Sequence, residues 1–172
     1  MKFGTFPIDQ AVGLVLAHTV RAAQVLKKGR VVSASDVQML RVSGISTVVA
    51  ARLEADDVGE DQAAARIASA LSGQGLHVSA AHTGRCNMTA GAAGIVLVDK
   101  AAVDAANAVH EAVTIATLPD YAAAGAGQIV ATVKIIPFAV PAGTLARSAR
   151  PVSTRMSAQR PAASASDRPE PK

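Results

Sequence analysis

The sequence is poor in aromatic residues and in cysteine. Its 172 residues include three Phe, one Tyr and no Trp, and Cys86 is the single cysteine. One cysteine cannot form an intrachain disulfide, so we expect a reducing, cytoplasmic environment. Because nucleic-acid bases stack on aromatic side chains, the scarcity of these side chains argues against nucleic acid as a partner. The core must be built from small and branched aliphatic side chains.

Long apolar segments are also lacking. No uncharged apolar run reaches the roughly 18 residues that a membrane-spanning helix needs. The best candidate, residues 86–98, is short and rich in glycine. The first ten residues, MKFGTFPIDQ, contain no apolar stretch of the kind found in signal peptides. We therefore expect no membrane partner and no export signal.

Positive charge is in excess, but not in the part that can fold. The net charge is +4, and residues 146–172 carry six basic and two acidic residues, which accounts for all of it. Residues 1–145 carry 11 basic and 11 acidic residues and are neutral. A basic face for nucleic acid is therefore not expected on the folded part. Residues 146–172 are rich in Pro, Ser, Ala and Arg, which predicts a disordered basic tail.

Residues 1–53 are predicted to form a small β-rich lobe with one short helix. Extended segments are expected at residues 3–6, 13–20 and 45–52, and residues 25–32 are expected to turn at Lys28-Gly29. Ser33 or Ser35 is expected to cap a helix that continues to Ser43, and Gly44 is expected to end it.

Residues 54–145 are predicted to form an α/β lobe with two main helices. A helix is expected at residues 60–71, with one apolar face made of Ala63, Ala64, Ile67, Ala68 and Leu71. The second helix is expected at 100–112. Strands are expected at 76–81, 94–98, 113–118 and 128–140, and loops at 83–94 and 120–127. This alternation of helix and strand predicts a mixed α+β fold with a mixed sheet.

The Gly-rich segment 83–94 is a candidate binding loop. Backbone amides freed by Gly84, together with the side chains of Thr83, Arg85 and Asn87, can hold an anion or the edge of a heteroaromatic ring. The alternative interpretation is a turn capped by Asn87, with Arg85 in solvent. The segment is neither a Walker A loop nor a G-x-G-x-x-G fingerprint.

Two further positions are candidates. Asn107, His110 and Glu111 fall at helical spacing, and Glu111 can accept hydrogen bonds from ring N–H groups. The alternative there is an ordinary polar helix end. Lys134 interrupts an apolar strand. It either guards a sheet edge against aggregation or meets a phosphate in a cleft, and both interpretations remain open.

No catalytic or metal-binding set is visible in the sequence. His77, His82 and Cys86 do not have the spacing of a zinc site. There is no G-x-S-x-G nucleophile motif. His18 is interpreted as a core or edge histidine rather than as a ligand. We predict neither a catalytic residue nor a metal.

Several segments together resemble one family. They are FGTFPIDQAVGLVLAHTVR, LKKGRVVSASDVQMLRVSGISTVVAARLEADDVGEDQAAARIA, TGRCNM, AGIVLVDKAAVDAANAVHEAVTIATLP and GQIVATVKIIPFAVP. They are similar to the N-terminal region of bacterial molybdopterin-binding proteins, over residues 2–141. In longer members this region precedes a molybdopterin-binding domain and often a nucleotidyltransferase domain, which attaches a nucleotide to molybdopterin.

The resemblance implies an accessory module of molybdenum cofactor biosynthesis. Such a module would bind molybdopterin or position it for a partner nucleotidyltransferase, without being catalytic itself, because the downstream domains of the family are not recognisable here. Arg85 and Lys134 would then face the phosphate, and Asn87, Asn107 and Glu111 the pterin edge. The alternative is a protein-docking module with no small-molecule site. Homo-oligomerisation is left open.

Overall fold

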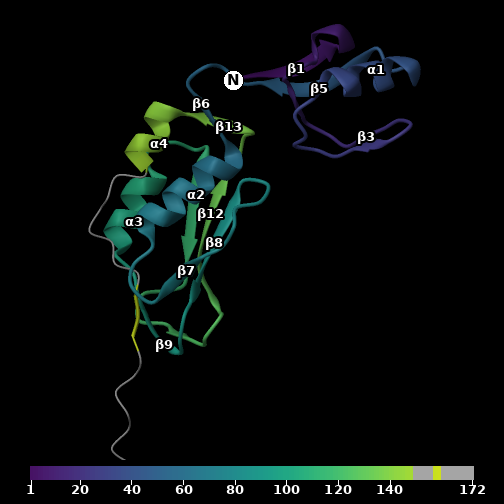
Figure 1. The fold of residues 1–172 in the computed structure, drawn as a ribbon. Helices are drawn as coiled ribbons and strands as arrows, with labels where there is room; N and C mark the ends of the chain where they lie inside the picture. Colours follow the sequence, from purple (N-terminus) through teal and green to yellow (C-terminus); the bar gives the residue numbers. More distant parts are fainter. Residues whose placement is uncertain (149–156, 160–172) are drawn as a thin grey trace, which may run out of the picture.

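The fold is a mixed α+β arrangement in two lobes, as the sequence predicts (Figure 1). The predicted mixed sheet is not found in the described residues, where all strand pairs of the second lobe are antiparallel. The computed structural model describes residues 1–148 and 157–159. Each lobe has its own cluster of buried apolar side chains. One cluster draws on residues 8–50 and the other on residues 58–145.

The first lobe contains a three-stranded antiparallel sheet in the order β1–β5–β2 and a small β3–β4 hairpin. Its elements are β1 (Lys2–Pro7), the 3-10 helix η1 (Ile8–Gln10), β2 (Val15–Leu16), β3 (Val20–Arg21), β4 (Val25–Leu26), α1 (Ala34–Val42) and β5 (Thr47–Arg52). The single strand predicted at 13–20 is wrong, because β2 pairs with β5 whereas β3 pairs with β4. The chain must leave the β2–β5 pairing after Leu16 before it enters the β3–β4 pairing at Val20.

The helix α1 begins with a capping box. The side chain of Ser33 accepts the N–H of Asp36, and the carboxylate of Asp36 accepts the N–H of Ser33. Arg30 donates two hydrogen bonds to the same carboxylate, at 2.9 and 3.0 Å. These donors lower the pKa of Asp36 to about 2, the Arg30 guanidinium having the largest effect. The cap predicted at Ser33 is confirmed.

We expect Asp36 to make the first lobe more stable at neutral than at acidic pH. A carboxyl whose folded pKa lies below its ordinary value of 3.8 stabilises the fold above that value and loses the effect as the pH falls through about 2. Asp36→Asn keeps a cap acceptor but removes the charge, and should lower the unfolding free energy by about 1 kcal/mol at pH 7. Urea unfolding of both proteins from pH 6 to pH 2 checks this. Two curves that stay parallel down to pH 2 would contradict it.

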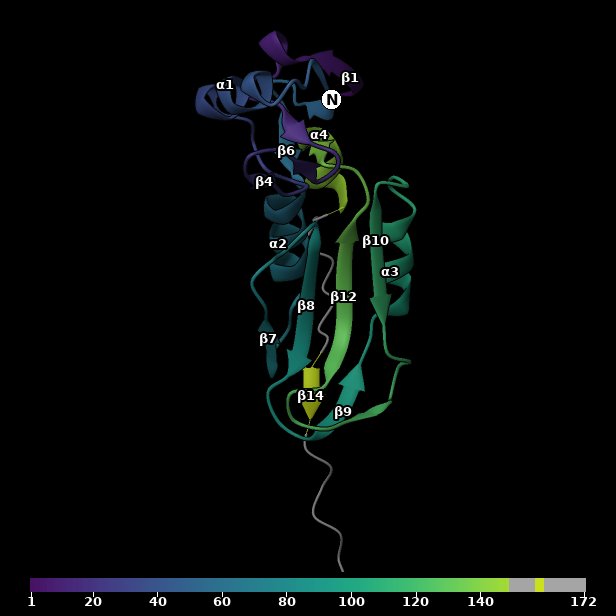
Figure 2. The same ribbon diagram turned by 90° about the vertical axis from the view of Figure 1, so that its right-hand side faces the viewer.

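The second lobe is built on a four-stranded antiparallel sheet in the order β10–β12–β8–β7, and Figure 2 shows these strands side by side. Its elements are β6 (Asp57–Gly59), α2 (Glu60–Leu71), β7 (Leu76–Val78), β8 (Arg85–Ala90), β9 (Gly94–Leu97), α3 (Lys100–Asn107), β10 (Val113–Thr117), β11 (Ala123–Ala124), β12 (Ile129–Ile135), β13 (Ala139–Pro141), α4 (Ala142–Ser148) and β14 (Ser157–Gln159).

Helices α2 and α3 cover one face of this sheet (Figure 1). The helix predicted at 60–71 is confirmed, and all five residues of its predicted apolar face are buried. They pack on the buried positions of β8 and β12, which include Cys86, Met88 and Val133. Apolar residues face the helices at every second position, and the residues between them lie on the other, open face.

The loop predicted at 83–94 is wrong over half of its length, since residues 85–90 form the interior strand β8. Asn87 and Thr89 suggest a loop in the sequence, but both lie on the open face while their neighbours Cys86 and Met88 are buried. Pairing with β12 on one side and β7 on the other therefore outweighs local propensity.

Two other predicted elements end early. The helix predicted at 100–112 stops at Asn107, whose side chain bonds both the N–H and the C=O of Ile115 on β10. The strand predicted at 128–140 is interrupted at Pro137, and the chain continues as β13, which pairs with β6 instead.

The predicted tail begins later than expected. Residues 146–148 complete the helix α4, in which Leu145 and Ser148 are buried. Residues 157–159 form β14, which pairs with β9. The rest of the predicted disordered tail lies outside the described residues.

Candidate functional site

The open face of the sheet carries three of the predicted site residues, Arg85, Asn87 and Lys134. Arg85 on β8 lies directly opposite Lys134 on β12. Opposite residues of an antiparallel pair share a face, so these two cations are neighbours. Asn87 lies opposite Thr132 in the same way, and its Oδ1 atom accepts a hydrogen bond from the Thr132 hydroxyl at 2.8 Å.

A tight turn precedes this face. His82 and Arg85 exchange backbone hydrogen bonds of 2.9 and 3.0 Å around Thr83 and Gly84, whose φ angles are +50° and +71°. Two positive φ angles define a type I′ hairpin turn. A β-branched residue such as Thr83 rarely adopts this conformation, so the turn stores strain. The Lys134 ammonium donates to the C=O of Thr83 and holds the turn against β12.

Two carboxylates from the start of α2 reach the same turn. Asp61 accepts the N–H of Gly84 at 2.6 Å. Glu60 is half-buried, and burial raises its pKa, although the nearby charge of Lys134 opposes this. The turn is therefore enclosed by charged groups of both signs.

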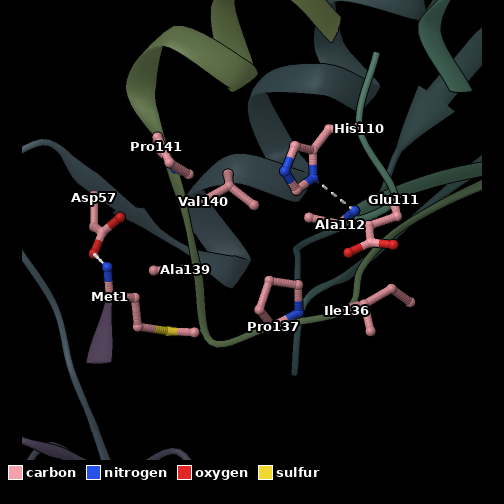
Figure 3. Close-up of a pocket in the computed structure, with 10 residues that line it drawn as sticks. All are labelled: Met1, Asp57, His110, Glu111, Ala112, Ile136, Pro137, Ala139, Val140 and Pro141. Atoms are coloured by element: carbon pink, nitrogen blue, oxygen red, sulfur yellow. Dashed lines mark hydrogen bonds and ion pairs between the residues drawn. The ribbon is translucent and has the colours of Figure 1, made fainter. Parts of the chain in front are cut away.

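A pocket of about 550 Å³ lies beside the end of β12, between β13, β6 and the loop that precedes β10 (Figure 3). Its lining is mostly apolar and comes from Met1, Ala112, Ile136, Pro137, Ala139, Val140 and Pro141, with Asp57, His110 and Glu111 as the polar members. Its volume and its largely apolar lining are in the range of sites for small organic molecules.

The polar groups of the pocket have defined roles. The Nδ1 atom of His110 accepts the N–H of Ala112 at 3.0 Å, so in the neutral imidazole the proton is on Nε2. The Glu111 side chain is exposed and forms no salt bridge within the described residues. Asp57 is engaged, because its Oδ2 atom lies 2.8 Å from the amino group of Met1. Figure 3 shows His110 and Glu111 on the pocket side away from Asp57.

The structure brings most of the predicted site residues to one end of the second lobe and separates one. Thr83, Gly84, Arg85, Asn87 and Lys134 belong to the turn and the open face. Glu111 lines the pocket.

Asn107 lies on the helix side of the sheet, where both groups of its amide are bound to Ile115. The helical spacing predicted for Asn107, His110 and Glu111 is wrong, because α3 ends at Asn107.

Lys134 is not an edge residue. Its strand, β12, lies between β8 and β10, so the interpretation of Lys134 as an edge guard is wrong.

Sequence reasoning missed Glu60 and Asp61 as neighbours of the turn and missed the walls of the pocket. Two features of the sequence could have suggested them: the acidic pair Glu60 and Asp61 at the start of α2, and Pro137, which interrupts the predicted strand. Neither feature is close in sequence to residues 82–85, so no local pattern connects them to the turn.

Within residues 1–148 and 157–159, no group of three His, Cys, Asp or Glu side chains is placed to hold a metal ion. Cys86 is buried, and burial raises the pKa of its thiol. No helix in the described part of the chain has the length and apolar character needed to cross a bilayer.

Residues 5–52, which make up nearly all of the first lobe, match a family described as a domain of unknown function (DUF8806). No curated protein and no solved structure matches the chain. All the residues that line the pocket, and those of the open face, lie outside the matched segment.

Proposed function

We propose that this chain is a binding module for a small heterocyclic molecule that carries a phosphate. The observation that carries the proposal is the pocket, with apolar walls on several sides and the free carboxylate of Glu111 at its rim. Apolar walls can pack against the faces of a ring, and a carboxylate accepts hydrogen bonds from ring N–H groups. The Nε2–H group of His110 supplies a donor for a ring oxygen or nitrogen.

The phosphate is assigned to Arg85 and Lys134. Arg85 and Lys134 lie directly opposite each other, so a phosphate between them can accept hydrogen bonds from both side chains once the Lys134 ammonium turns from the C=O of Thr83. The two parts of the site are adjacent along the chain, since Ile136 of the pocket follows Lys134 by two residues. Asn87 pairs with Thr132, on the side of Arg85 and Lys134 that is away from the pocket, so in this proposal it can contact the phosphate but not the ring. Asn107 takes no direct part, because Ile115 occupies its amide.

Molybdopterin is the ligand that the family resemblance supports, since it joins a pterin ring to a phosphate. In this proposal the chain is a cytoplasmic, non-catalytic accessory module of molybdenum cofactor biosynthesis. It holds molybdopterin or presents it to a partner nucleotidyltransferase. The exposed position of Arg85 agrees with presentation to a second protein.

The test uses a phosphorylated pterin and the same pterin without phosphate. The chain has no Trp, so pterin fluorescence is read without interference. We expect Glu111→Gln to weaken binding of both probes by about tenfold, and Arg85→Ala to weaken only the phosphorylated probe by a similar factor. Arg66→Ala, at an exposed position of α2, is the matched control and should change neither affinity.

Calorimetric titration with molybdopterin itself then tests the identity of the ligand. Binding that is absent, or that is equal in the wild-type and Arg85→Ala proteins, would contradict the proposal.

A docking module without a small-molecule site is the second candidate. It is favoured by the exposed valines of the first lobe, among them Val31 at 60% and Val42 at 89% exposure. If neither pterin binds, and a purified molybdopterin nucleotidyltransferase still co-precipitates with the Arg85→Ala/Lys134→Ala protein, the docking function replaces the first proposal.

A further inference from the structure

The outer edge of β9 is closed by a segment from the far end of the chain. The strand order in this small sheet is β11–β9–β14, and β14, drawn in yellow, lies beside β9 in Figure 2. The pairing is antiparallel with a defined register, which joins Ser157 with Leu97, Ala158 with Val96 and Gln159 with Ile95.

The backbone of β9 determines which residues of β14 hold the contact. Both backbone groups of Val96 point away from β14. Its N–H donates to the C=O of Ala122, and its C=O accepts the N–H of Tyr121. Successive residues of a strand direct their backbone groups to opposite sides, so those of Ile95 and Leu97 face β14.

The register then assigns the partners on β14. Ser157 and Gln159 are the hydrogen-bonded residues, opposite Leu97 and Ile95. The N–H of Ala158 points away from β9, because its opposite residue is Val96. Within the described residues 157–159 the segment is held by two hydrogen-bonded residue pairs, and these must offset the entropy lost when the three residues are ordered. Such a contact opens readily.

We infer that the outer edge of β9 is a strand-addition site whose occupant is this chain's own segment Ser157–Gln159. When the segment leaves, Ile95 and Leu97 present unpaired N–H and C=O groups that accept an extended peptide in the same register. The segment thus guards the edge. The inference is independent of the proposed ligand site, since β9 lies at the opposite end of the lobe from the pocket strands β6 and β13 (Figure 1).

Amide hydrogen exchange in the full chain tests the guard. Ser157→Pro removes an N–H that faces β9, and exchange at Ile95 and Leu97 should become at least tenfold faster. Ala158→Pro removes an N–H that faces away and is the matched control, so exchange should stay slow. Equal exchange at Ile95 and Leu97 in the wild-type, Ser157→Pro and Ala158→Pro proteins would overturn the inference.

A synthetic peptide of residues 151–163 tests the edge itself. Added to the Ser157→Pro protein, it should restore slow exchange at Ile95 and Leu97. The same peptide N-methylated at Ser157 should not, whereas methylation at Ala158 should be tolerated. Failure of the unmodified peptide would overturn strand addition. Slow exchange in the wild-type protein that depends on protein concentration would show that a second copy supplies the segment, and would overturn the intramolecular assignment.

Discussion

Gly84→Ala is expected to lower the free energy of unfolding of the second lobe by about 3 kcal/mol. Gly84 has a φ angle of +71°, and a Cβ atom there would lie 2.7 Å from the C=O oxygen of Ile135 and 2.7 Å from a carboxylate oxygen of Glu60. The Glu60 side chain can rotate away, but the Ile135 carbonyl is part of β12. Both backbone groups of Gly84 are also bound, its N–H to Asp61 and its C=O to the N–H of Ile135. The turn therefore cannot relax without breaking these bonds.

Two variants separate the causes of this loss. Gly127 has a similar φ angle, +78°, but a Cβ atom there would meet nothing within 4 Å. Gly127→Ala should therefore cost only the conformational strain, about 1 kcal/mol. Removing the Glu60 side chain in the Gly84→Ala background should restore little stability, because the contact with Ile135 remains. Urea unfolding followed by circular dichroism measures all three. Equal losses for Gly84→Ala and Gly127→Ala would show that the close approach to Ile135 has no effect.

Ile67→Ala is expected to cost about 3 to 4 kcal/mol. Ile67 is fully buried, and its helix, α2, packs across β8 and β12. The buried cluster that contains Ile67 is rich in small residues, such as Ala63, Ala64 and Ala68, and small side chains cannot expand into the space that is left. The cavity therefore persists, and the cost includes both the lost burial and the empty volume.

Ser69→Ala is the matched control for this helix. Ser69 is exposed on the opposite face of α2, so its substitution should change the unfolding free energy by less than about 0.5 kcal/mol. The measurement is urea unfolding of both variants under the same conditions. A loss below about 1 kcal/mol for Ile67→Ala would mean that the lobe repacks around the smaller side chain, contrary to the expectation from its small-residue core.

Sequence reasoning succeeded where the determinants are local. The capping residue Ser33, the positive-φ residue Gly44 and the apolar stripe of α2 act within a few residues of chain, and the structure contains the corresponding elements. It failed where a partner far along the chain decides. Residues 85–90 look like a polar loop, but β12, about 45 residues later, makes them an interior strand. Asn107 looks like a residue within a helix, but its bonds to Ile115 end that helix.

For the candidate site, too, the sequence indicated the residues but not their arrangement in space. Arg85, Asn87, Lys134 and Glu111 were identified from their chemical type and their interruption of apolar or small-residue segments. The sequence could not show that Arg85 and Lys134 lie opposite each other, because β-strand register depends on pairing between distant segments. Nor could it show the pocket, whose walls come from residues as far apart as Met1, Ala112 and Pro141.

The sequence by itself determined the mixed α+β class, the aliphatic core and the neutral charge of residues 1–145, because composition and local periodicity decide these properties. Tertiary structure alone decided that the Gly-rich segment is a strand, that Lys134 lies inside the sheet, and that Glu60 and Asp61 meet the turn at Gly84. The physical reason is that strand pairing and pocket formation join groups whose separation along the chain leaves no local pattern.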